Sequence, residues 1–435
     1  MNSKALTKIQ TAALIAIVAV AAVAGGAAYV LWSSPAQPTE NVRIGICADL
    51  DSAYGRNVWQ GAVLAAEQTN AEGGFLGRNI TVIGEDDDGE SSTDIAVGIN
   101  ALTKLITIDK ADYVISPGML NTLAYQDVCC EHKKIFINIA DGSDDYSQRV
   151  LDNYEKYKYS FRTQPLNDTT IATRMLGEII AVGKYTGFTK VALLFDDMPL
   201  AKAIASGLSV SLPENGLEVV YNALYSFGTT DFASYFAAIE ESGAEILVPW
   251  IIMAEVPFVK EWYDRQSPLV VWGVLASAQD SDFWELTEGK CNTMSFSGLP
   301  AIAGYPLTNK TAPAREAYVQ RWGEAPNMLA VATYDTVRFV LADAVRRAGT
   351  TETEAVIHAL ETIDVETASA RHFVFTTSHD VLAKSQSPNT PSEDYFLYFI
   401  FQWQNGTQVP MYPEAIAKEA GGTYKYPNWD GPWSK

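Results

Sequence analysis

Four polar segments of this sequence each follow a run of strand-forming residues, and such segments are where an α/β sheet presents its chemistry. They span residues 49–55, 86–92, 117–122 and 140–144. Ligands of open α/β sheets bind beyond the carboxyl ends of the strands, where loops lead into helix N-termini. A helix beginning at Asn121 or Thr122 would direct unpaired backbone N–H groups and a positive dipole end at this edge, which suits a carboxylate.

Each of these segments also has a purely structural interpretation. Asn121 and Thr122 could serve as N-caps, a role that is compatible with ligand contact. Asp141, in the stretch DGSDD, could belong to an ordinary turn. Tyr54, which precedes a glycine, could pack within its loop or cover a ligand. These alternatives stay open from the sequence alone.

The acidic run 85–90 could in principle bind calcium. Gly84, however, stands where an EF-hand-like loop needs its first oxygen ligand. We therefore interpret the run as a solvated strand end and expect no metal site.

The sequence carries no recognisable catalytic or cofactor-binding signature. It contains no GxSxG, HExxH or GxGxxG pattern, no GxxxxGK[ST] phosphate loop, and only four scattered histidines. Its four cysteines do not have zinc-site spacing, and buried free thiols and disulfides both remain open for them. The formal charge of −21 disfavours nucleic acid as a partner. We expect a protein that is not an enzyme and needs no cofactor.

Strand and helix patterns alternate along the chain in two series. Residues 42–88 form a βαβ unit, in which the glycines of GGFLGRN let the helix stop and reverse. Further βα cycles include the strands ADYVIS and KIFINI. After a crossing segment, YSFRTQP, the alternation restarts with the strands KVALLF, LEVVY, EILVPW and LVVWGV, which indicates a second parallel α/β lobe. NTMSFSGLP is predicted to be a second crossing, back to the first lobe. We expect strands near HFVFTTSHD and YFLYFIFQWQNG, where the chain would cross a third time and end on the second lobe. With 435 residues, two lobes are the natural expectation.

The N-terminus carries an apolar segment. Residues 11–32 contain no charge and follow Lys4 and Lys8, so a helix of this length would cross a hydrocarbon core of about 30 Å with the body outside the cell. Cleavable signal peptides have shorter apolar cores. We favour an uncleaved signal anchor (residues 1–33 with the cytoplasmic N-terminus) followed by a linker (34–41), and cleavage is the alternative.

From residue 42 to about 413 the sequence resembles the branched-chain amino acid type of extracytoplasmic solute-binding protein of ABC importers. The matches are modest but occur in the family's order: GGFLGRN, FRTQPLND, the strand end FDD, TTDFASYFAAIEESGAEILV, AYVQRWGEAP, ATYDTVRFVLADAV and FQWQNG with MYP. The resemblance implies a type I periplasmic-binding fold, an α/β architecture of two Rossmann-like lobes joined by a three-segment hinge. We predict lobe 1 at residues 42–160 and 298–378, and lobe 2 at 161–297 and 379–435.

The resemblance also implies the ligand-binding residues. In the first lobe these are Tyr54, the loop Leu120, Asn121 and Thr122, and the loop Asp141, Gly142 and Ser143. In the second lobe, an ungapped alignment puts Leu200, Ile252 and Leu275 where the amino-acid binders carry two tyrosines and the glutamate that pairs with the ligand ammonium. A shift of one or two residues would bring in Trp250 or Ser277 instead.

The missing glutamate argues against a free α-amino acid, because a buried ammonium without a carboxylate partner is expensive to desolvate. An apolar wall opposite a polar one suits a small carboxylate with an apolar or aromatic body, or a neutral amide. We therefore predict a monomeric, membrane-anchored receptor that closes over a small solute outside the cell and serves ABC permease subunits with a cytoplasmic ATPase. A ligand-sensing ectodomain or co-receptor of the same fold is the alternative.

Overall fold

The computed structural model describes residues 40–88, 94–118, 121–383 and 395–434. The predicted signal anchor at residues 11–32 and the site residue Leu120 lie outside this part of the chain. Within it, no helix combines the length and the apolar character that a membrane crossing requires.

The N-terminal part of the chain forms a five-stranded parallel sheet in the order β2-β1-β3-β4-β5. The strands β1, β3 and β4 are almost wholly buried, which explains their nearly continuous apolar sequences, whereas the edge strand β2 is mostly half-buried. We call this sheet, with the helices packed on it, the first lobe. The strands are β1 (Val42–Ala48), β2 (Ile80–Asp86), β3 (Tyr113–Ser116), β4 (Ile135–Asn138) and β5 (Ser160–Arg162).

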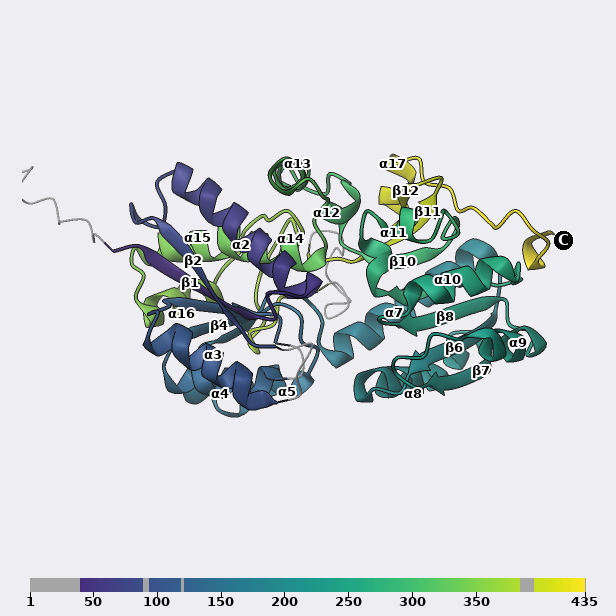
Figure 1. Ribbon diagram of the computed structural model, residues 1–435, viewed down its shortest axis with the longest axis horizontal. Coiled ribbons are helices and arrows are strands. Elements are labelled where there is room, and N and C mark those ends of the chain that lie inside the picture. The colour runs from purple at the N-terminus through teal and green to yellow at the C-terminus, as the bar shows by residue number, and fades with distance from the viewer. Residues whose placement is uncertain (1–39, 89–93, 119–120, 384–394, 435) are drawn as a thin grey trace, which may run out of the picture. The chain divides into compact units, whose positions relative to one another are not determined.

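Helices cover both faces of this sheet (Figure 1). On one face lie α2 (Ala53–Ala71), α14 (Met328–Asp335), α15 (Ala342–Ala348) and α16 (Thr353–Glu361), with a π-helical stretch Thr336–Leu341 joining α14 to α15. The other face carries α3 (Ile95–Thr107), α4 (Thr122–Glu131) and α5 (Asp144–Asp152). The helices α6 (Tyr154–Tyr157), α12 (Pro300–Ala303) and α13 (Thr311–Trp322) complete this region.

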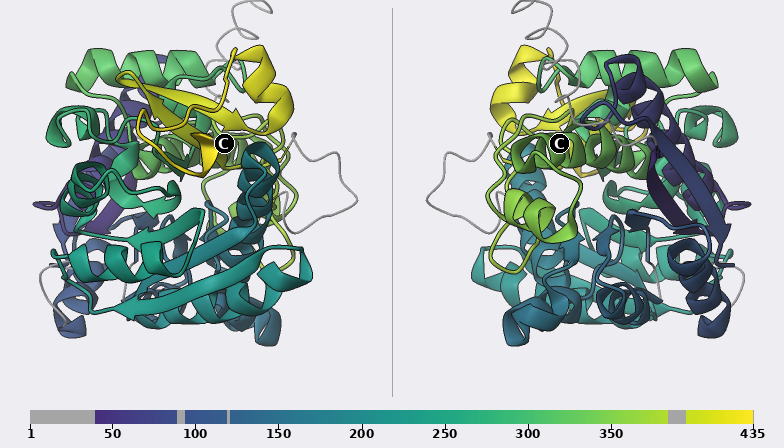
Figure 2. Two further views of the ribbon diagram at one scale, coloured as in Figure 1. Left: turned by 90° about the vertical axis from the view of Figure 1, so that its right-hand side faces the viewer. Right: turned by 90° about the vertical axis from the view of Figure 1, so that its left-hand side faces the viewer.

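A second sheet has seven strands in the order β12-β11-β10-β9-β8-β6-β7. Five run parallel, while β11 pairs antiparallel with β10 and β12; the last two strands are yellow in Figure 2. This sheet and its helices form the second lobe. The strands are β6 (Lys190–Asp196), β7 (Glu218–Tyr225), β8 (Ile246–Ile251), β9 (Val270–Leu275), β10 (Ser295–Gly298), β11 (Phe399–Gln404) and β12 (Thr407–Tyr412).

Side chains alternate between the two faces of the second sheet, as strand geometry requires. Phe195 belongs to the core that also contains residues of α7 (Asp168–Thr186) and α8 (Pro199–Glu214), whereas Leu194 belongs to a separate core. That second core contains residues of α9 (Ala233–Glu241), α10 (Glu255–Asp264) and α11 (Phe283–Leu286). Helix α17 (Glu414–Glu419) follows β12.

The structure refines three sequence-based expectations. Part of the predicted crossing YSFRTQP is β5, the fifth strand of the first sheet. Part of NTMSFSGLP is β10, which pairs with β9. The stretch HFVFTTSHD, predicted to contain strands, forms only isolated bridges, because the chain turns at His379 with a φ of 61°. The predicted strands at 396–406 are present and extend the second sheet.

Candidate functional site

The N-terminus of α4 lies at the carboxyl edge of the first sheet, next to the end of β3. Thr122 is the first residue of this helix and is 2% exposed, and its Oγ1 is buried without a hydrogen-bond partner among the residues that the structure describes. Gly118 has a φ of +72°, and a Cβ there would lie 1.9 Å from Thr122 Oγ1, so glycine is required at this position. The predicted helix start is therefore confirmed, and its first hydroxyl lacks a partner.

Asn121 occupies the N-cap position of α4 but does not act as a side-chain cap. Its backbone N–H donates to Gly118 O at 2.9 Å, and its buried side chain interacts with Tyr125 one turn along the helix. Tyr125 in turn donates to Asp87 at the end of β2 (3.0 Å). Asn121 is thus the N-cap of α4 by position, as one interpretation predicted, but its side chain belongs to a buried network and does not cap the helix, and Thr122 is the first helical residue.

The loop after β1 holds Tyr54 in the first turn of α2. Ser52 caps this helix by accepting from Gly55 N (3.0 Å), and it also donates to Asp49 O (2.8 Å). A Cβ at Gly55 would lie 1.9 Å from Asp49 O, so only glycine fits. Tyr54 is half-buried and packs against the main core. The structure thus supports the loop-packing role and places Tyr54 at the same sheet edge as α4.

The loop after β4 is ordered by its own side chains. Asn138 Oδ1 accepts from Ala140 N (3.0 Å) and Asp141 N (2.9 Å), and Asp141 Oδ2 accepts from Ser143 N (3.2 Å). Ser143 then caps α5. Burial raises the pKa of Asp141 to about 6, although the nearby Arg162 guanidinium opposes this shift. The segment therefore forms the turn that one interpretation predicted. This turn holds the Asp141 carboxyl group at the edge of the sheet.

Arg162, which was not predicted as a site residue, stabilises this loop by hydrogen bonding to it. Its side chain is completely buried; Nη2 donates to Ser143 O, and Nε lies 3.5 Å from Asp380 Oδ1. Its backbone N–H donates to His379 O at 2.9 Å. The guanidinium Nη1 is buried without a hydrogen-bond partner. The sequence feature that could have indicated Arg162 was an arginine, followed by Thr and Gln, within the predicted crossing segment YSFRTQP.

The two lobes touch close to these loops. A Cβ on Gly142 would lie 3.5 Å from Leu200 Cδ2 in the first turn of α8. Elsewhere, Gln279 Nε2 in the second lobe lies 3.6 Å from Met328 Sδ at the start of α14. The structure therefore brings together two predicted site residues, Gly142 and Leu200, from segments far apart in the sequence.

The predicted apolar wall of the second lobe is only partly assembled. Trp250 is 6% exposed and stacks on Phe195 with ring centroids 6.0 Å apart, and Ile252 packs against the same core. Leu275 belongs instead to the core on the opposite face of the sheet. The cause is strand alternation: Val274, its neighbour in β9, takes the face that the wall requires. The grouping of Leu275 with Trp250 and Ile252 is therefore wrong.

Ser277 is bound to a carboxylate that the sequence analysis missed. Its backbone N–H donates to Glu255 Oε1 at 3.1 Å, and the Glu255 side chain is buried at the start of α10. Burial raises the pKa of Glu255, whereas interactions with its own backbone, Ser277 and Met253 lower it. The sequence feature that could have indicated Glu255 was an acidic residue four positions after the end of β8. Its acceptor capacity is largely used within its own loops.

A further carboxyl group makes this edge of the second lobe unfavourable for an anion. Burial raises the pKa of Asp280 to about 7, and the carboxylates of Asp282, Glu255 and Glu324 raise it further. Like charges so close together disfavour the charged form of each group.

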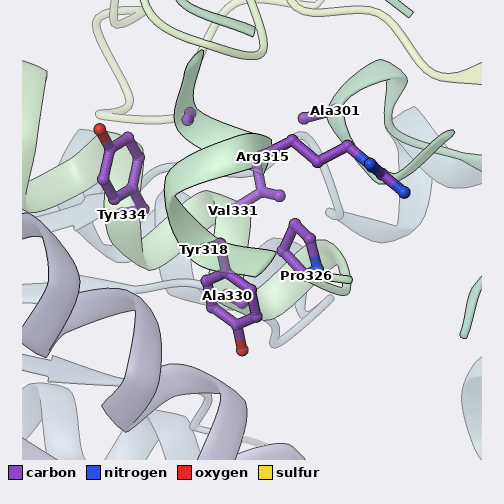
Figure 3. A pocket seen from close by; sticks show the side chains of 8 residues that line it. Ala301, Arg315, Tyr318, Pro326, Ala330, Val331 and Tyr334 are labelled. Carbon is purple, nitrogen blue, oxygen red and sulfur yellow. The ribbon is translucent and has the colours of Figure 1, made fainter. Parts of the chain in front are cut away.

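A cavity in the described part of the chain is too small for a solute. It lies where α13 and α14 meet and has a volume of about 10 Å³, roughly the space that one water requires (Figure 3). Its lining is almost wholly apolar, including Ala301, Ala314, Pro326 and Val331. We interpret it as a packing defect between helices.

Two lobes with wholly or largely parallel sheets, whose loops gather at the carboxyl edges of the strands, define the type I periplasmic-binding fold. Residues 41–408 match the model of the family described as periplasmic binding protein. The match covers most of the sequence, and the chain belongs to this family.

Individual relatives are distant. Leu/Ile/Val-binding protein homolog 7 of Brucella suis biovar 1 (strain 1330) is 23% identical over 385 residues, covering 82% of this chain and 87% of that protein. A solute-binding protein of an ABC transporter from R. palustris, solved with benzoate, has a TM-score of 0.67 at 16% identity, covering 85% of this chain and 95% of that one. A branched-chain amino acid transporter substrate-binding protein from Streptococcus pneumoniae, solved with isoleucine, has a TM-score of 0.68 at 18% identity, with 85% and 98% covered.

Proposed function

We propose that this protein is the extracytoplasmic receptor of an ABC importer and binds a small carboxylate with an apolar body. The family assignment supports a binding role rather than catalysis. The ligand would lie between the lobes, with its carboxylate at the first lobe and its apolar part toward the second.

The observation that carries the proposal is the unpartnered hydroxyl of Thr122 at the N-terminus of α4. A buried polar atom without a hydrogen-bond partner costs roughly 1–3 kcal/mol, and a ligand that supplied the missing bond would remove this cost. The adjacent backbone N–H groups and the helix dipole favour an anion there. The carboxyl groups around Asp280 disfavour one in the second lobe.

The second lobe supports an apolar ligand body without an amino group. Leu200, which lies where the lobes touch, and Ile252, which packs against the main core, are half-buried apolar side chains. Glu255 is the buried carboxylate that could pair with a ligand ammonium, but it already accepts a hydrogen bond from Ser277 N. The relatives solved with benzoate and with isoleucine illustrate the two alternatives, an aromatic acid and an amino acid.

Binding at both lobes would favour a closed arrangement, because a ligand shifts an equilibrium by its differential affinity for the two states. We propose lobe boundaries at 42–160 with 298–378, and at 161–297 with 379–435. The closed form would be presented to permease subunits that work with a cytoplasmic ATPase. We further propose that the protein acts as a monomer, tethered outside the membrane by residues 1–33 and the linker 34–41.

Calorimetry on the full-length protein in detergent tests the ligand class. The probes are 4-methylpentanoate, benzoate, leucine and leucinamide. We expect one of the two acids to bind at least about tenfold more tightly than leucine, a difference of about 1.4 kcal/mol, because the leucine ammonium would be desolvated without a free carboxylate. Tight leucine binding with no binding of either acid would overturn the proposal.

A transport role is tested by reconstitution. Liposomes containing the partner permease and ATPase subunits should hydrolyse ATP faster when the loaded receptor is added. An unchanged rate, together with co-purification of a kinase or a chemotaxis receptor, would favour the sensory alternative.

A further inference from the structure

Three large apolar side chains are exposed at the carboxyl edge of the second sheet. The neighbouring strands β8, β6 and β7 end level with one another in the register of this sheet. The second residue beyond each strand end is apolar and exposed, in this order Met253 (71%), Met198 (37%) and Phe227 (47%). Adjacent strands lie about 5 Å apart, so the three residues start from neighbouring points of one edge. We call them the apolar row.

Carboxylates fix the backbone of two members of the apolar row. Met198 N donates to Asp196 Oδ1, and Phe227 N donates to Asp197 Oδ1, both at 3.0 Å. These bonds hold the loops after β6 and β7 in one geometry. The exposed side chains are therefore presented from an ordered backbone.

Met253 is held in a strained conformation by buried side chains. Its φ of 74° lies in the left-handed region, which a residue with a long side chain adopts only at a cost in free energy. The buried Glu255 carboxylate binds the Met253 backbone N–H and accepts from Ser277 N at 3.1 Å. On the other side of Met253, the Tyr225 hydroxyl donates to Trp250 O at 2.9 Å. The loop is thus fixed on both sides of a residue whose own side chain is exposed.

Met253 also lies between two places where the second lobe touches the first. Strand β8, which precedes it, lies between β6 and β9 in the sheet. After β6, Leu200 Cδ2 lies 3.5 Å from the position of a Cβ on Gly142. After β9, Gln279 Nε2 lies 3.6 Å from Met328 Sδ. The loop between these two contacts therefore faces the first lobe, and yet it carries the most exposed large apolar side chain of the described residues.

We infer that Met253 is a specificity-determining residue, on which the apolar body of the ligand packs when the ligand carboxylate is bound at the first lobe. This inference rests on the proposed function, from which it takes the ligand class. It adds a residue that the sequence comparison did not select, in place of the wall that Leu275 was expected to complete.

The surroundings of Met253 favour an apolar group over a charged one. Glu255 lies two residues away, and its carboxylate interacts electrostatically with that of Asp280. These carboxyl groups disfavour a ligand carboxylate at this edge, whereas they do not repel a hydrocarbon. A methionine side chain is unbranched and polarizable, so it adapts to apolar bodies of different shape. We expect acids with longer apolar bodies to bind more tightly than short ones.

Calorimetry on the full-length protein in detergent tests this role with propanoate and 4-methylpentanoate. Met253→Ala should weaken the binding of 4-methylpentanoate at least about fivefold, because the longer body loses apolar contact with the thioether side chain. The binding of propanoate, whose body is too short to gain much from that contact, should change little. Met253→Leu restores an apolar side chain of similar volume and should regain most of the lost affinity.

Two variants separate ligand contact from a structural role. Met253→Gly removes the side chain and suits the left-handed backbone, so it should unfold at no lower urea concentration than the wild type and still lose affinity as Met253→Ala does. Phe227→Ala is the matched control, because Phe227 has the same place in the apolar row but follows the edge strand β7, outside the two interlobe contacts. It should leave the binding of both acids unchanged.

Chemical protection tests the same role without a mutation. Dilute hydrogen peroxide converts exposed methionine to its sulfoxide, which peptide mass spectrometry measures. Saturating 4-methylpentanoate should slow this oxidation at Met253 more than saturating propanoate does. An equal rate with and without either acid would count against the contact.

The inference is overturned if Met253→Ala binds both acids as the wild type does. A loss of permease-stimulated ATP hydrolysis in that variant, with affinity retained, would instead assign Met253 to the contact with the permease. If the wild type binds leucine and neither acid, the proposed function is overturned. The same comparison, made with leucine against free alanine, would then decide the role of Met253 separately.

Discussion

Gly142 faces Leu200 across the contact between the lobes, with room for little more than a hydrogen on its α-carbon. A Cβ there would lie 2.8 Å from Leu166 O and 3.5 Å from Leu200 Cδ2. The close approach is therefore to the Leu166 carbonyl, whereas Leu200 on α8 would be in ordinary van der Waals contact with an added Cβ. Replacing Gly142 by alanine tests how closely these segments approach one another.

Gly142→Ala should destabilise the protein by about 1–3 kcal/mol, because the new methyl group must displace a backbone carbonyl. It should also weaken ligand binding by holding the lobes apart. Urea unfolding and calorimetry measure the two effects. Gly207→Ala is the matched control on α8: a Cβ there meets nothing within 4 Å, so the free energy of unfolding should rise by about 0.5–1 kcal/mol and affinity should not change. Equal behaviour of the two variants would contradict the tight contact.

Thr122→Val should raise the free energy of unfolding by about 1 kcal/mol and yet weaken carboxylate binding at least about tenfold. In the free protein the hydroxyl has no hydrogen-bond partner among the described residues, which lowers stability. In the proposed complex it would donate a hydrogen bond to the ligand carboxylate. Thermal unfolding with and without ligand separates the two effects. Thr69→Val removes another buried, unpartnered hydroxyl, on α2, and should give the stability gain alone. If both variants bind the ligand equally well, Thr122 is not a ligand residue.

Leu200→Ala and Leu275→Ala should have opposite effects. Leu200 is half-buried at the interlobe contact, so its truncation should weaken ligand binding about tenfold with only a small loss of stability. Leu275 is buried in the other core, and its truncation should cost about 2–5 kcal/mol of stability while affinity is retained. Chemical denaturation and calorimetry on both variants decide this. A loss of affinity in Leu275→Ala would restore Leu275 to the ligand-facing wall.

The stability of the protein should depend on pH through Asp141. Its pKa is raised from 3.8 to about 6 in the folded state, so between pH 4 and 6 the folded state binds more protons than the unfolded one. The free energy of unfolding should therefore fall as pH rises through this window, by at most about 3 kcal/mol. Asp141→Asn should lack this contribution, whereas Asp145→Asn, on the exposed side of the same turn, should keep it. Urea unfolding at several pH values measures the difference, and parallel curves for wild type and Asp141→Asn would refute it.

Most of the fold was predictable because it follows from local patterns. The strands around Ile44 and Val114 are continuous apolar runs, and glycines such as Gly74 end the intervening helices, so the order of elements is readable in the sequence. The short strands β5 and β10 were missed because their pairing depends on partners far along the chain.

The site was less predictable, because its geometry depends on which face each side chain takes. The start of α4 at Thr122 follows from a local pattern, and it was found. The position of Leu275 depends on the register of β9 against its neighbours, and an ungapped comparison placed it on the wrong face. Arg162 and Glu255 were missed because their importance comes from burial and from contacts with distant segments.

One buried cluster of apolar side chains contains residues of both sheets, from Ile44 in β1 to Val248 in β8, and includes Leu166, Leu299 and Tyr398 from the crossing segments. The lobes therefore do not have fully separate interiors. Heating should melt them in a single calorimetric transition, and damage to either sheet should lower the melting temperature of the whole body. A protein built in this way cannot lose one lobe and keep the other folded.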